Sequence, residues 1–194
     1  MAYHLADAEV HCRRHGRIDT VSNTTPGLVC AHHHLYSSLA RGMPAPHQTP
    51  RNFIEILQQV WWKLDAALDA DMIYWSTALG AVEALMNGTT AIVDHHESPN
   101  SIEGSLSIIA RACSDVGVRV NTCYGISDRW DDLGYLHSKI SPLSPMSGAA
   151  KRGLAECERF IAEGGNGMVG VHAAFTCGDE TLSAAAQLAT KLNV

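Results

Sequence analysis

The sequence predicts an α/β fold in which a parallel sheet is covered by helices. Four short apolar runs, containing β-branched residues and bounded by glycine, proline or polar residues, recur along the chain. Each run is followed by a longer segment whose apolar residues have helical spacing. Strands that alternate with helices at this spacing are typical of parallel sheets. We therefore expect about four strand–helix units between residues 23 and 194.

The order of these elements follows from the apolar runs and the residues that interrupt them. The expected strands are 27–31, 89–94, 118–124 and 168–175. The expected helices are 52–68, 71–87, 102–116, 148–163 and 179–192. Glycines at 88, 117 and 164 favour helix ends, and Asp179 is the expected N-cap of the last helix.

Two stretches do not fit this repeat. Glu9–Cys12 and Arg17–Val21, separated by Gly16, resemble short antiparallel strands. We interpret residues 1–22 as the remnant of a small accessory β-domain and residues 23–194 as the main domain. Residues 128–147 have little periodicity and are expected to form an irregular loop.

The composition excludes several classes of function. The chain has 194 residues, 46% of them hydrophobic and 18% charged, and a net charge of −6 without any basic block. Nucleic-acid binding is therefore disfavoured, and no apolar stretch is long enough for a membrane span. The N-terminal residues do not resemble a secretory signal, and six dispersed cysteines without a Cys-X-X-Cys pair favour reduced thiols. A cytoplasmic location is the expectation.

Histidines gather where the predicted strands end. Six of the eleven histidines follow or lie in three of the four strands, whose carboxyl ends form the usual functional face of such folds. His32 and His34 stand two residues apart, so in an extended chain both imidazoles point to the same face. Such a pair can chelate zinc at about 2.0–2.1 Å. Alternatively the triplet is a loop feature or a chance run. In either case His33, which points to the other face of the strand, is expected to pack against the protein.

Four further residues are candidates for the same face. From the sequence alone, His172 could be a third metal ligand, a hydrogen-bond donor to substrate, or a buried histidine with a backbone partner. Asp94 could orient an imidazole, with His95 beside it at the mouth, although a plain loop role is equally consistent. Arg41 could hold a substrate anion, although a solvated or ion-paired arginine is the more common outcome.

Several segments together resemble the amidohydrolase superfamily of metal-dependent TIM-barrel hydrolases. The opening is Pro26-Gly-Leu-Val-Cys-Ala-His-His-His34, followed by Ala40-Arg-Gly-Met-Pro44. Further matches are Trp61–Asp69, Asn87–His96, Leu154–Ile161 and His172–Thr176, which are similar to SsnA-type aminohydrolases of the chlorohydrolase and deaminase branch. The resemblance implies a divalent metal, zinc or iron, that activates water for attack on an aromatic heterocycle carrying an amino or halide group. It implies that His32 and His34 are metal ligands and that His172 contacts the substrate.

The resemblance also defines what this segment does not carry. Relatives have a following His-X-X-Glu segment, then another histidine and an aspartate that binds the metal, and these are expected beyond Val194. The sequence thus predicts the first half of a TIM (β/α)8 barrel, inactive by itself because a catalytic zinc needs three protein ligands. The alternative is a non-catalytic half-barrel that serves as a binding or assembly module. Self-association into a homo-oligomer is left open.

Overall fold

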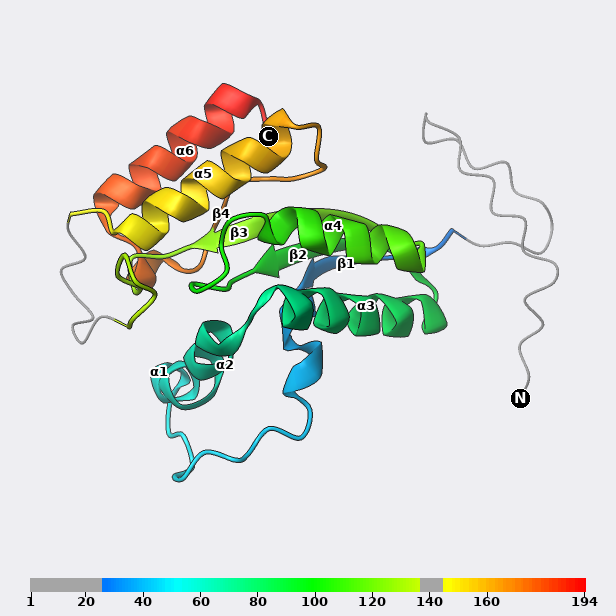
Figure 1. Ribbon diagram of the computed structural model, residues 1–194, viewed down its shortest axis with the longest axis horizontal. Coiled ribbons are helices and arrows are strands. Elements are labelled where there is room, and N and C mark those ends of the chain that lie inside the picture. The colour runs from blue at the N-terminus through cyan, green and yellow to red at the C-terminus, as the bar shows by residue number, and fades with distance from the viewer. Residues whose placement is uncertain (1–25, 137–144) are drawn as a thin grey trace.

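Four parallel strands form a single sheet in chain order, as the sequence predicts (Figure 1). The computed structural model describes residues 26–136 and 145–194. Within them the strands are β1 (Leu28–His33), β2 (Thr89–His96), β3 (Arg119–Ile126) and β4 (Gly170–Val171). The strand order β1-β2-β3-β4 with a helical connection after each strand is that of half a TIM barrel. The expected accessory β-remnant, residues 1–22, lies outside the described residues.

The helices follow the strands in sequence and in space. They are η2 (Leu35–Ala40), α1 (Phe53–Ile56), η3 (Leu57–Trp61), α2 (Trp62–Ala67), α3 (Ala70–Met86), α4 (Ser105–Val116), α5 (Gly148–Ala162), η4 (Ala174–Thr176) and α6 (Asp179–Leu192). Figure 1 shows α6, α5, α4 and α3 succeeding one another, each packed on the next. The single helix expected over 52–68 is two short α-helices joined by a π-helical stretch.

Helix ends agree with the sequence to within a few residues. The Asp69 side chain accepts a hydrogen bond from the Met72 amide at 2.8 Å and caps α3. Gly117, with a φ of 96°, ends α4 in the left-handed conformation that favours glycine. The expected cap of α6 is one residue late, because Gly178 has the extended N-cap conformation and Asp179 is the first helical residue.

The fourth strand is much shorter than expected. Residues 168–175 contain only two strand residues, preceded by an isolated bridge between Gly167 and Thr122. The hydroxyl of Thr176 donates a hydrogen bond to the Ala173 carbonyl, which turns the chain into a 3-10 helix just past the strand. At Gly170 a Cβ atom would lie 2.4 Å from the sulfur of Cys123, so β4 approaches β3 more closely than a larger residue allows.

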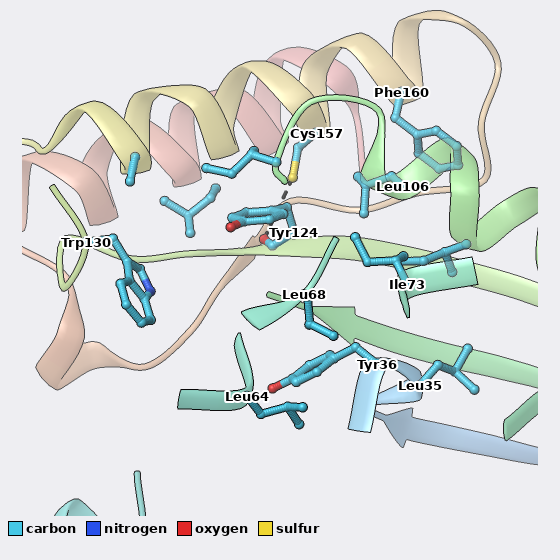
Figure 2. Packing of buried hydrophobic residues seen from close by; sticks show 14 of the residues in the cluster. Leu35, Tyr36, Leu64, Leu68, Ile73, Leu106, Tyr124, Trp130, Cys157 and Phe160 are labelled. Atoms are coloured by element: carbon cyan, nitrogen blue, oxygen red, sulfur yellow. Dashed lines mark hydrogen bonds between the residues drawn. The ribbon is translucent and has the colours of Figure 1, made fainter. Parts of the chain in front are cut away.

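The hydrophobic core lies between the sheet and its helices (Figure 2). Ile73, Leu106 and Tyr124 are buried in it, and Trp62 is 3% exposed. At the edge of the sheet, in contrast, Leu28 and Val29 of β1 are 62% and 63% exposed. No helix among the described residues is long and apolar enough to cross a membrane. Burial therefore decreases from β3 toward β1.

Candidate active site

The carboxyl ends of the strands bring four of the predicted histidines together. His32 lies near the end of β1 with His34 just beyond the strand, His95 lies near the end of β2, and His172 follows β4. The ring centroids are 4.8 Å apart for His32 and His34, 5.3 Å for His34 and His95, and 6.5 Å for His95 and His172. Residues far apart in the sequence thus form one continuous row of imidazoles across the carboxyl-terminal end of the sheet.

His32 and His34 face each other through their Nε2 atoms, which are 3.0 Å apart. The Nδ1 atom of His34 lies 2.9 Å from the carbonyl oxygen of His95. Because a carbonyl only accepts, Nδ1 carries the hydrogen, and in the neutral ring the lone pair is on Nε2. Burial lowers the pKa of His34, which favours this neutral form. The ring is therefore held in the state in which a histidine binds a metal.

The histidine pair fits a zinc ion in its donors and in its spacing. Two nitrogens bound tetrahedrally to one zinc at about 2.0–2.1 Å lie about 3.3–3.4 Å apart, close to the separation observed here. Within residues 26–136 and 145–194, however, no three side chains of His, Cys, Asp or Glu form a metal-binding group. The described residues supply two ligands, and zinc sites usually have three or four.

Asp94 connects three structural elements, η2, β2 and β3. Its Oδ1 atom accepts a hydrogen bond from the Leu35 amide at 2.8 Å, and its Oδ2 atom accepts one from the Thr122 hydroxyl at 3.0 Å. The side chain is fully buried, and burial raises its pKa to about 7. Asp94 therefore holds the start of η2 and the strand β3 against β2. The hydrogen bond that orients the His34 imidazole is accepted by the backbone carbonyl of His95.

His172 lies in a buried polar environment that includes one residue that sequence reasoning missed, Glu97. The Nδ1 atom of His172 is 3.0 Å from the Thr176 hydroxyl, and its Nε2 atom is 3.4 Å from Oε2 of Glu97. Glu97 is 1% exposed and directly follows β2. A signal was available in the sequence, because residues 95 and 97 share one face of an extended chain as residues 32 and 34 do.

A second buried acid approaches this site from outside the strands. Asp65 belongs to α2, which lies on the side to which the strand arrows point (Figure 1), and its side chain is completely buried. Burial and the charge of Glu97 raise the pKa of Asp65 well above its usual value. Burial likewise raises the pKa of Glu97 to about 8. Burial thus disfavours the charged form of both carboxyl groups.

Arg41 is not brought to the histidines. Its guanidinium group forms an ion pair with Glu83 near the end of α3, and both side chains are exposed to solvent. The pairing raises the pKa of Arg41 and lowers that of Glu83. The structure thus shows the ion-paired alternative for this residue, and a substrate-binding role has no contact here to support it.

The order of the units and the paired histidines can now be compared with known proteins. The sequence profile described as the amidohydrolase family matches residues 23–194. The chain belongs to the amidohydrolase family. It is 32% identical over 194 residues to the 5-methylthioadenosine/S-adenosylhomocysteine deaminase of Symbiobacterium thermophilum, covering 100% of this chain and 38% of that protein. It is 30% identical over 176 residues to the 5′-deoxyadenosine deaminase of Methanocaldococcus jannaschii, covering 87% of this chain and 36% of the relative.

Solved structures share this fold. The atrazine chlorohydrolase TrzN from Arthrobacter aurescens TC1, complexed with zinc, superimposes with a TM-score of 0.65 at 20% identity, over 87% of this chain and 39% of TrzN. An amidohydrolase from an environmental sample of the Sargasso Sea superimposes with a TM-score of 0.58 at 18% identity. This amidohydrolase chain therefore spans between a third and two fifths of the length of these relatives.

Proposed function

We propose that this chain forms the first half of the barrel of a metal-dependent hydrolase that acts on a nitrogen heterocycle. The bond hydrolysed is a C–N bond to an amino group, as in the deaminase relatives, or a C–Cl bond, as the name of TrzN suggests. The metal is a divalent ion, zinc or iron. When bound, it would acidify a water molecule for attack on the ring carbon.

One observation carries this proposal, namely the convergence of two imidazole Nε2 atoms at 3.0 Å with the tautomer of His34 fixed by the His95 carbonyl. A metal ligand needs an available lone pair, and the hydrogen bond to Nδ1 leaves that lone pair on Nε2. At the same end of the sheet, His172 is the residue proposed to contact the heterocycle. The remaining metal ligand, the aspartate that activates water and the proton-shuttling glutamate are proposed to come from the part of the barrel that the relatives have beyond this segment.

Zinc binding by the chain tests the assignment of the ligands. Titration calorimetry with Zn²⁺ should give one bound ion for the wild type and none for His32→Ala or His34→Ala. His33→Ala is the matched control, because the middle imidazole of the triplet points away from the other two and its removal should leave binding intact. Zinc binding that is unchanged in both the His32 and His34 variants would overturn the metal site proposed here.

Turnover tests the division of the site between two parts of the barrel. We expect no ammonia release from adenine nucleosides and no chloride release from chlorotriazines by the 194-residue chain. Clear turnover, lost again in His34→Ala, would show that two histidines suffice and would contradict the proposed need for further ligands. A cytoplasmic location belongs to the same proposal and is supported by the unpaired thiols of the described cysteines.

A second function, an assembly module that completes a barrel by self-association, is favoured by the exposed edge of the sheet. Leu28 and Val29 on β1 are more than half exposed, and an unpaired strand edge with apolar side chains is an association site. Size-exclusion chromatography with light scattering distinguishes the two functions. A discrete folded dimer supports the module, whereas a monomer or irregular aggregates contradict it.

A further inference from the structure

The side chain of Glu97 stands between an indole and an imidazole. Its Oε1 atom accepts a hydrogen bond from the indole N–H of Trp130 at 2.7 Å. Its Oε2 atom has no hydrogen-bond partner among the described residues and lies 3.4 Å from Nε2 of His172. The glutamate is 1% exposed and the His172 side chain 15%, so water competes little for these contacts. Figure 2 shows Trp130 together with Tyr124 in the same core.

The positions of the hydrogens along this row follow from the partners at its two ends. At one end, the hydroxyl of Thr176 donates to the Ala173 carbonyl at 2.9 Å, so its oxygen is left to accept from Nδ1 of His172. Nδ1 therefore carries the hydrogen, and Nε2 has the lone pair. At the other end, Oε1 of Glu97 accepts from the indole, so a proton held by the carboxyl group is placed on Oε2, the oxygen that faces Nε2.

We propose that Glu97 is a positioning residue for His172: its carboxyl group, oriented by Trp130, faces Nε2 and keeps the imidazole in the tautomer with hydrogen on Nδ1. This inference rests on the proposed function, in which His172 contacts the heterocycle. It defines the chemistry of that contact. Nε2 is an acceptor, so the group of the ligand that reaches His172 is an N–H donor, such as an amino substituent or a protonated ring nitrogen. At 3.4 Å the carboxyl group is farther from this lone pair than in a normal hydrogen bond, so an N–H group of the ligand can take its place there.

The charges around the pair are consistent with two neutral partners. The charge of Glu97 raises the pKa values of Asp65 in α2, Tyr36 in η2 and Tyr124 in β3, in each case in addition to burial, so these three groups surround the pair. Burial raises the pKa of Glu97 to about 8 and lowers that of His172 to about 4. Between these values the carboxyl group is protonated and the imidazole is neutral.

Nitrogen NMR of the His172 side chain tests the proposal without any need for turnover. In the wild type we expect one tautomer with hydrogen on Nδ1 at neutral pH, and a change in the Nε2 shift as Glu97 ionises near pH 8. In Glu97→Gln the amide can accept from Trp130 and donate to Nε2, so the tautomer should persist while the alkaline inflection disappears. In Glu97→Leu the second tautomer should become populated. The signal is assigned from its loss in His172→Gln.

Glu158→Gln is the matched control, since Glu158 is exposed and pairs with Lys191 on α6. Its spectra should equal those of the wild type. An inflection that survives in Glu97→Gln, or a Glu97→Leu protein that keeps the single tautomer, would overturn the inference. If Glu97→Leu does not fold, the inflection in Glu97→Gln decides alone. Zinc titration of the same proteins separates the metal-site proposal from the tautomer proposal. If the wild type binds no zinc, the metal site is refuted, and the tautomer measurement remains valid.

Discussion

His96 provides a test of how burial controls the protonation of histidines at the carboxyl-terminal end of the sheet. The side chain is completely buried between the rings of Tyr36 and Tyr124, at centroid distances of 5.5 and 6.1 Å. Its Nε2 atom lies 2.8 Å from the Ser98 hydroxyl, which itself donates to the Ser101 carbonyl, so Nε2 is the donor. Burial lowers the pKa of His96 from 6.5 to about 3. The folded protein therefore contains this imidazole in the neutral form.

The magnitude of the effect follows from proton linkage. The pKa is lower in the folded state than in the unfolded state, so the unfolded chain binds more protons and stability falls with decreasing pH. The stabilisation is complete above 6.5 and is lost progressively down to the folded pKa of about 3. At about pH 5 the unfolded histidine is almost fully protonated, and the loss from this one residue is about 2 kcal/mol. Asp94 and Glu97, whose pKa values are raised, change stability in the opposite direction.

The comparison of two proteins isolates His96 from these other groups. At about pH 8 we expect the free energy of unfolding of His96→Gln, measured by urea denaturation, to differ from that of the wild type only by the cost of the altered packing. At about pH 5 the difference should move by about 2 kcal/mol in favour of the variant, because glutamine does not titrate. His47→Gln, at an exposed loop position, is the control, and its curve should parallel that of the wild type. A pH-independent difference for His96→Gln would refute the reasoning.

Three further predictions concern packing and the exposed ion pair. Asp94→Ala leaves the buried Thr122 hydroxyl and a backbone amide without an acceptor, and should lower the free energy of unfolding by about 2–5 kcal/mol, while Asp94→Asn, which can still accept from the amide, should cost less. Gly153→Ala should destabilise by about 1–3 kcal/mol in the same urea assay, because the new Cβ would lie 2.8 Å from the Tyr124 ring. Arg41→Ala removes only an exposed ion pair and should leave the melting temperature unchanged, and a large decrease would show that the residue has a further partner.

The order of strands and helices was predictable because its signals are local. Apolar runs, glycine stops and helical spacing each depend on a few neighbouring residues, and they predicted the four strand–helix units correctly. The shared face of His32 and His34 is local in the same sense, since it requires only that the chain be extended. The boundaries of β4 were wrong because its pairing is limited by the turn at Thr176 and by the close approach of Gly170 to Cys123, which no local pattern reports.

Strand alternation could have indicated the face on which Glu97 lies, but the burial of the site's two acids and their proximity to each other could not be predicted, for a different reason. Asp65 and Glu97 are 32 positions apart in the sequence and belong to a helix and a strand end that meet only in the folded chain. A carboxyl group in a sequence is interpreted as solvent-exposed unless a partner is visible, and neither residue has one nearby. Asp94 illustrates the same limit. Its place at a strand end is visible in the sequence, but its hydrogen bonds with a backbone amide and a threonine hydroxyl exist only in the folded chain.

The two sides of the site differ in how far this segment completes them. On the side of β4, His172 is surrounded by Glu97 and Thr176 and is largely buried, so its tautomer is determined by contacts within the described residues. On the side of β1, His32 is exposed near the end of the strand. The imidazoles of His32 and His34 would leave two positions of a tetrahedral zinc ion to water. If the proposed metal site is correct, metal affinity depends on ligands beyond those that the described residues supply, whereas the state of His172 depends on contacts within them. This arrangement predicts weak zinc binding and a single His172 tautomer. Tight zinc binding together with two His172 tautomers would show instead that the preorganised side of the site is at β1.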